Sequence, residues 1–154
     1  ADHGMSAKTH LVDLGKILAD KGIENNSVPI IKDRYVAHHN NLGGCYIIYL
    51  DEVNVNRAID ILNAIEGVDS ALKREDAVNK FNLNAGRIGQ IVVNGDKDTV
   101  FGNADEIDMP VGLRSHGSEH EREVPIIGYN LQNKKFQFTE NRDVGRYVIA
   151  VLGL

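Results

Sequence analysis

The stretch from residue 34 to residue 102 most constrains the fold, because it alternates β-rich runs with segments of helical periodicity. Its clearest helix spans residues 53–66 and is followed by Gly67 at a typical helix-ending position. Five apolar residues share one face of that helix: Val55, Ala58, Ile59, Leu62 and Ile65. A shorter helix is predicted at 75–81, with two acidic residues in its first turn.

The same stretch predicts a set of short strands. These are residues 34–39, 44–50, 68–72, 88–93 and 98–102. Two turn sequences, 40–43 and Asn94-Gly95-Asp96-Lys97, predict hairpins between the strands that flank them. We therefore expect a self-contained α+β unit, with an antiparallel sheet on one side and helices on the other.

The flanking segments are of a different kind. Residues 10–21 have helical spacing, Glu123 to Tyr129 reads as a strand, Phe136 to Phe138 as another, and 140–152 as a closing helix. The fold class is therefore α/β. The expected organisation is a core segment at 1–33, an inserted α+β cap at 34–102 and a second core segment at 103–154.

Charge and composition exclude several functions. The net charge of −5 disfavours a nucleic-acid or anionic membrane partner, and no apolar run is long enough to span a bilayer. Cys45 is the only cysteine, so an internal disulfide is excluded, which fits a cytoplasmic protein. Because Cys45 lies in an apolar run, we expect a buried residue rather than a nucleophile.

Two distant segments carry metal-ligand chemistry. Asp2-His3, followed by Gly4, offers a carboxylate oxygen and an imidazole nitrogen, which suit zinc or manganese. His116 lies in a Ser-His-Gly loop ahead of an apolar stretch and can supply a further ligand. If the segments converge, the site performs metal-assisted hydrolysis; if they do not, Asp2-His3 and His116 are surface loop residues.

Other candidates are weaker. His120 is the rival ligand, but three neighbouring glutamates favour a charged surface position for it. His38 and His39 are adjacent strand residues that face opposite ways, which argues against joint ligation. Lys8 follows the Asp-His segment closely enough to reach an anion or to remain solvated. Gly-rich phosphate loops and a Gly-x-Ser-x-Gly nucleophile motif are absent from the sequence.

Taken together, these segments resemble a known family. Residues 1–8 resemble the second metal-ligand motif of the alkaline phosphatase superfamily, closest to the phosphonoacetate hydrolases and their nucleotide pyrophosphatase/phosphodiesterase relatives. Residues 113–118, with Glu121 and the run 124–127, resemble the last ligand motif of that superfamily. Residues 33–39 and 87–93 resemble the phosphonoacetate hydrolase cap.

This resemblance implies the carboxy-terminal part of a two-zinc hydrolase. Asp2 and His3 would hold the zinc on the nucleophile side, and His116 the zinc on the water side. The implied substrate is a small phosphonate, cleaved at its carbon–phosphorus bond to phosphate and acetate. The family's threonine nucleophile and its other ligands have no counterpart here, so we expect an amino-terminal part of the same protein to supply them.

Two alternatives stay open on the sequence alone. One is another reaction of the superfamily, a nucleotide pyrophosphatase/phosphodiesterase-like hydrolysis. The other is a non-catalytic α+β ligand-binding module with incidental histidines. A homodimer is compatible with either, and the sequence does not fix the assembly.

Overall fold

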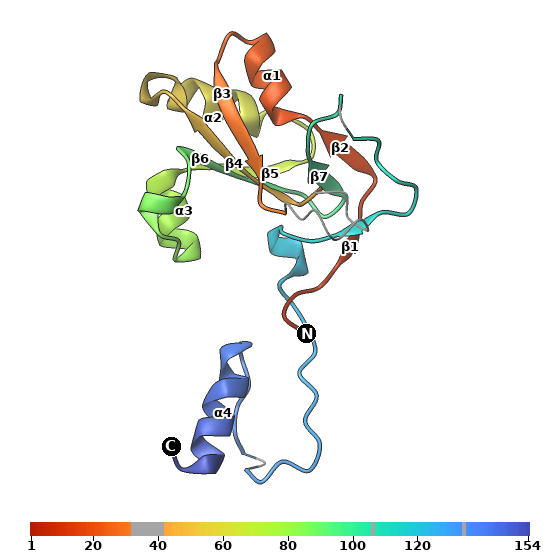
Figure 1. Cartoon of the computed structure of the whole chain (residues 1–154), viewed down its shortest axis with the longest axis vertical. Helices are drawn as coiled ribbons and strands as arrows, with labels where there is room; N and C mark the ends of the chain where they lie inside the picture. The colour runs from red at the N-terminus through yellow and green to blue at the C-terminus, as the bar shows by residue number, and fades with distance from the viewer. Residues whose placement is uncertain (32–41, 106, 134) are drawn as a thin grey trace.

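A four-stranded antiparallel sheet forms the centre of the computed structural model, which describes residues 1–31, 42–105, 107–133 and 135–154 (Figure 1). The strand order is β3 (Asn25–Pro29), β4 (Cys45–Leu50), β6 (Ile91–Gly95) and β5 (Val68–Lys73). Ile47 lies opposite Val28 on one side and Val92 on the other, which fixes the register. The strands predicted at 44–50 and 68–72 are confirmed.

Side chains of β4 alternate between two apolar layers, as the two-residue repeat of a strand requires. Tyr46, Ile48 and Leu50 pack into the main core beneath α1 (Leu14–Asp20) and α2 (Val55–Asn63). The other face carries a smaller core, in which Cys45 and Val92 pack with Ala77 of α3 (Arg74–Phe81). Helices therefore cover both faces of the sheet, and the expectation that they lie on one side only is wrong.

The predicted helix at 10–21 begins later than expected. Residues His10–Val12 form strand β2, which pairs in parallel with β7 (Thr99–Phe101). The helix α1 starts only after Asp13, whose carboxylate accepts a hydrogen bond from the backbone N–H of Lys16 at 2.9 Å. This N-cap satisfies one of the free amides of the first turn.

The hairpin predicted at Asn94-Gly95-Asp96-Lys97 is also wrong, although both of its strands exist. After the turn, β7 leaves β6 and pairs with β2. The backbone N–H of Gly95 donates instead to Gly44 O at 2.8 Å, and that of Phe101 donates to Gly43 O at 2.9 Å. These long-range bonds satisfy the strand amides, and they outweigh the local turn preference.

The carboxy-terminal part departs most from its predicted strands. In the described chain, residues 123–129 form an extended, mainly exposed segment with no strand assignment, because Pro125 lacks an amide donor and no described strand lies alongside. Phe136 and Phe138 instead pack against Tyr147 of α4 (Arg142–Leu152), with ring centroids 5.4 and 5.5 Å away. The closing helix itself is confirmed, and it lies apart from the sheet (Figure 1).

Short elements complete the chain. They are β1 (Ser6–Ala7), β8 (Arg114–Ser115) and the 3-10 turns η1 (Glu52–Asn54), η2 (Ala85–Arg87) and η3 (Glu119–Glu121). The strand predicted at 34–39, including His38 and His39, lies outside the described residues. No helix in the described ranges has the length and apolar character needed to cross a bilayer.

The sheet draws on both sides of the expected boundary at residue 33. Strand β3 comes from the segment 1–33, whereas β4, β5 and β6 come from the segment 34–102. The division into two core segments and a cap stays a prediction.

Replacing Leu62 by Ala should lower the free energy of unfolding by about 2–5 kcal/mol, because Leu62 of α2 is fully buried in the main core. The matched control is Leu152→Ala, since Leu152 of α4 is 64% exposed and should cost less than about 0.5 kcal/mol. Urea denaturation of the purified chain measures both. Equal losses in the two variants would contradict this description of the core.

Candidate metal centre

Strand pairing brings the two predicted metal-ligand segments together. Strand β1 pairs with β8 in antiparallel register, with Ser6 opposite Ser115. On one side of this pair the Gly4 N–H donates to Glu121 O at 2.7 Å, and on the other the Lys8 N–H donates to Leu113 O at 2.9 Å. The loop before β1 and the loop after β8 are therefore neighbours, although more than a hundred residues separate them.

The imidazole rings of His3 and His116 stack on each other. Their centroids lie 3.8 Å apart and their planes differ by 20°. His120 instead places Nε2 at 2.6 Å from Oδ2 of Asp69 on β5. We predicted that His116, not His120, would approach Asp2 and His3; the stacking agrees with this for His3, and the approach to Asp2 stays a prediction. Ligation of a metal by these residues is a separate question and stays a prediction.

A backbone contact fixes the orientation of the His3 ring. Its Nδ1 lies 2.9 Å from Gly4 O, so Nδ1 donates there and Nε2 is the ring nitrogen left to meet other groups. That Nε2 lies 3.8 Å from Oδ2 of Asp2. The pKa of Asp2 is lowered by its own backbone hydrogen bond and by the nearby His3, which favours the carboxylate form. A metal-bound histidine commonly has its second nitrogen fixed by a carbonyl in this way.

The donor set fits zinc in kind but not in number. Two ligands about 2 Å from a tetrahedral ion lie roughly 3.3 Å apart, so the spacing of Asp2 and His3 needs only a small closure. Among the described residues, however, no group of three or more His, Cys, Asp or Glu side chains is placed to hold one ion. Asp2, His3 and His116 can therefore supply only part of a zinc shell.

Close backbone approach positions the His116 loop. The Gly44 N–H donates to His116 O at 2.8 Å, and the Ser115 hydroxyl donates to Leu42 O at 2.5 Å. Gly117 has a φ of +109°, a conformation that favours glycine. A side chain at Gly44 would come within 2.8 Å of Cβ of Ser118, so the loop can pack here only against a glycine.

A buried ion pair joins the two loops. Lys8 Nζ lies 3.1 Å from Oε1 of Glu121, and both side chains are almost fully buried. Lys8 also donates to Lys97 O at 2.8 Å. Glu121 accepts through Oε2 from the Ser118 N–H and hydroxyl, at 2.9 and 2.8 Å. The anion that Lys8 reaches is thus a carboxylate of the same chain.

Sequence reasoning missed this structural role of Glu121, although a signal was present. Ser118 and Glu121 have the Ser-x-x-Glu spacing of a capping box, and they form one at η3. Burial raises the pKa of the Glu121 carboxyl. Hydrogen bonds from Ser6, Ser118 and Lys8, together with the charge of Lys8, lower it by a larger amount. The net pKa lies below its ordinary value, so Glu121 is an anion at neutral pH.

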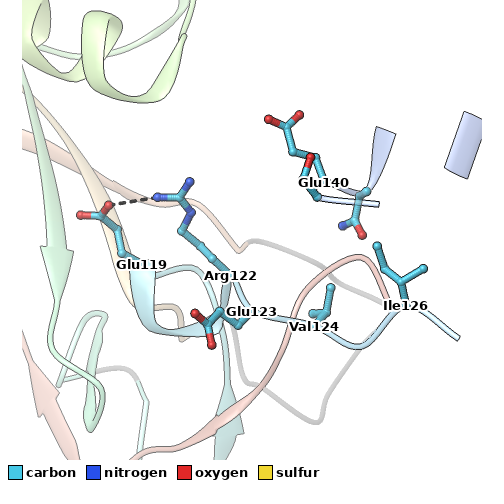
Figure 2. A pocket seen from close by; sticks show the side chains of 8 residues that line it. Glu119, Arg122, Glu123, Val124, Ile126 and Glu140 are labelled. Atoms are coloured by element: carbon cyan, nitrogen blue, oxygen red, sulfur yellow. Dashed lines mark hydrogen bonds and ion pairs between the residues drawn. The ribbon is translucent and has the colours of Figure 1, made fainter. Parts of the chain in front are cut away.

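A hollow of about 730 Å³ opens beside the Asp2 loop (Figure 2). Glu119 and Arg122 lie on one side of it, with a 3.3 Å ion pair, and Ile126 and Glu140 lie on the other. Asn141, also in its lining, donates from Nδ2 to Asp2 O at 2.8 Å. Three glutamates against one arginine make the lining net negative, so the hollow does not by itself suit an anionic ligand.

Cys45 is buried as expected. Burial raises the pKa of its thiol to about 12, so the side chain is uncharged at neutral pH. An uncharged buried thiol is a poor nucleophile, which leaves Cys45 a packing residue.

Breaking the buried pair should destabilise the fold strongly. Glu121→Gln or Lys8→Met each leaves one buried charge without its partner, so each should cost about 3–5 kcal/mol at pH 7. The exposed pair of Lys16 and Asp105, 2.9 Å apart, provides the control, since Lys16→Met should leave the free energy of unfolding nearly unchanged. Urea denaturation measures all three variants.

The cost of Glu121→Gln should also depend on pH. A carboxyl with a lowered pKa in the folded state stabilises at neutral pH, and that stabilisation is lost as the pH falls through its folded pKa. The gap in unfolding free energy between wild type and Glu121→Gln should therefore shrink below pH 4.5, the ordinary pKa of glutamate. A difference in unfolding free energy that stays constant down to about pH 3 would show that Glu121 is not the buried anion described here.

Comparison with solved structures shows which known proteins this fold resembles. No protein-family model matches the chain. The crystal structure of phosphonoacetate hydrolase from Sinorhizobium meliloti 1021 in complex with phosphonoacetate is similar, with a TM-score of 0.70 and 32% identity. The match covers 79% of this chain and 32% of that one. The complex of the same enzyme with phosphonoformate has a TM-score of 0.70, 31% identity and the same coverage.

A more distant likeness is to human ectonucleotide pyrophosphatase/phosphodiesterase 5, with 19% identity and a TM-score of 0.49 over 77% of this chain and 28% of that one. The chain spans about a third of the length of the phosphonoacetate hydrolase it matches. By its identity and its fold over that part, the chain resembles part of a phosphonoacetate hydrolase, an enzyme of the alkaline phosphatase superfamily.

Proposed function

We propose that this chain supplies part of the metal site of a zinc-dependent hydrolase that cleaves the carbon–phosphorus bond of phosphonoacetate, releasing acetate and phosphate. The observation that carries the proposal is the convergence of His3 and His116, 3.8 Å apart between ring centroids, from loops at opposite ends of the sequence. The 32% identity to a phosphonoacetate hydrolase supports this reaction over others of the superfamily.

Each candidate ligand has a proposed role. Asp2 and His3 hold one zinc ion through a carboxylate oxygen and Nε2, and the Gly4 carbonyl fixes the His3 ring. His116 holds a second zinc ion, since its ring lies against that of His3 on the neighbouring loop. Bound zinc supplies Lewis-acid stabilisation of phosphoryl oxygens and a water of lowered pKa.

The remaining parts of the site lie outside these residues in the proposal. Catalytic zinc normally keeps three protein ligands, and this chain provides two for one ion and one for the other. Because the chain spans only about a third of the phosphonoacetate hydrolase it matches, we assign the other ligands and the nucleophile to the rest of the whole protein. The chain alone should then show no turnover, even with excess zinc.

Replacing His3 or His116 by Ala in the whole protein should lower its zinc content and abolish phosphonoacetate hydrolysis. Each ion would lose a ligand directly, so activity should fall by more than the roughly 10–100-fold that loss of an outer-shell partner costs. Elemental analysis by mass spectrometry measures zinc, and phosphate release measures activity. Cys45→Ala is the control, because Cys45 is buried on the sheet and should alter packing only.

Three outcomes would contradict the proposal. They are normal turnover by a His116→Ala protein, full activity after exhaustive chelation, and faster hydrolysis of bis(p-nitrophenyl) phosphate than of phosphonoacetate. The last would favour the phosphodiesterase-like alternative, in which the same ligands serve a different substrate.

A further inference from the structure

A second cavity lies on the face of the sheet turned away from the main core. It has a volume of about 240 Å³. Its lining comes from strands β4 and β6, from the end of α3, and from residues 117–119 with Arg122. This volume is below the range of about 300–1,000 Å³ for pockets that hold drug-sized molecules, so it suits a ligand with a single ring.

The walls of this cavity are mainly apolar. They include Ile47 and Val92 on the strands, Phe81 on α3 and Ile88 after η2. Cys45 adds to the same surface, and it does so as a neutral thiol because burial raises its pKa to about 12. Apolar walls favour a ligand whose body is hydrocarbon, since its transfer from water is favourable.

One buried polar group lines the cavity without a partner. Asn94 on β6 is 5% exposed, and no residue that the structure describes accepts a hydrogen bond from its Nδ2. Its side chain lies on the same sheet face as Val92, two residues before it along the strand. An unpaired buried donor costs free energy, and a ligand that carries an acceptor would remove that cost.

The charges at the cavity wall are already paired. Glu119 forms ion pairs with Lys80 of α3 at 2.5 Å and with Arg122 at 3.3 Å, and the pair with Lys80 joins α3 to the segment that contains Glu119. An ionic ligand would therefore have to compete with existing pairs, whereas an uncharged one would not. We infer that the cavity binds a small, uncharged, single-ring ligand with one hydrogen-bond acceptor. This acceptor accepts a hydrogen bond from the side-chain amide N–H of Asn94.

This site does not depend on the proposed hydrolase function. None of its described lining residues is a candidate metal ligand, although Gly117 and Ser118 directly follow His116. Binding can be tested on the chain without metal, so failure of the zinc proposal would leave the result interpretable.

The experiment is an NMR titration of the isotope-labelled chain, free of zinc, with three probes of similar size. Acetophenone offers a ketone acceptor, ethylbenzene offers none, and benzoate carries a charge. Acetophenone should give saturable shifts at Ile47, Val92 and the Asn94 side-chain amide. Ethylbenzene should bind about tenfold more weakly, the equivalent of one net hydrogen bond, and benzoate more weakly than acetophenone.

Two variants separate the hydrogen bond from the cavity. Asn94→Leu should reduce acetophenone affinity to that of ethylbenzene. The matched control is Ser70→Ala, which removes another buried polar atom that has no partner among the described residues. Ser70 lies beside Asn94 but outside the cavity lining, so this change should leave affinity unchanged. If Asn94→Leu does not fold, nuclear Overhauser contacts between the wild-type Asn94 amide and acetophenone replace it, and their presence supports the inference.

The inference is overturned if acetophenone gives no saturable shifts at the cavity residues. It is also overturned if Asn94→Leu binds acetophenone as well as wild type does, if the wild-type amide shows no contact to the ligand, or if benzoate binds more tightly than acetophenone.

Discussion

The buried ion pair between Lys8 and Glu121 is the constraint on which the candidate site depends. The Asp2-His3 loop lies just before Lys8, and the His116 loop lies just before Glu121. Two strands of only two residues each, β1 and β8, would hold such loops weakly. The ion pair, the capping box at η3 and the bond from Gly4 to Glu121 add the fixed contacts that keep His3 against His116.

A charge pair in this position has a particular advantage. Buried pairs contribute little net stability relative to apolar residues, but removing one partner is costly. The pair therefore specifies one arrangement of the two loops more than it stabilises the fold. Ser6 and Ser118 donate further hydrogen bonds to Glu121, and the Lys97 carbonyl accepts one from Lys8. Such a connected network holds the two loops on a rigid support, which the proposed metal centre would require.

The sequence predicted local elements well where periodicity and packing agree. The amphipathic pattern at 53–66 and the β-rich run at 44–50 became α2 and β4, because the same apolar residues form the main core. Predictions failed where a long-range partner decided the outcome. Residues 10–12 and 99–101 pair with each other, which removed the first turns of the expected helix and the expected hairpin. Residues 123–129 have strand-forming side chains but lack a described neighbour with which to pair.

The candidate site was likewise predicted in part. Motif resemblance selected His3 and His116 from six histidines, and their rings do meet. The ion pair that joins their loops was not predicted, because the contact between Lys8 and Glu121 spans 113 residues and has no local sequence signature. Only the capping-box spacing of Ser118 and Glu121 could have indicated that this glutamate faces inward.

Zinc-edge anomalous diffraction from crystals of the whole protein tests the central claim most directly. The account predicts two peaks roughly 3.5–4 Å apart, as in two-metal hydrolases. One should lie about 2.1 Å from His3 Nε2 with the Asp2 carboxylate in its shell, and the other at the same distance from a His116 nitrogen. Peaks absent from both histidines, or bound only elsewhere in the protein, would contradict it.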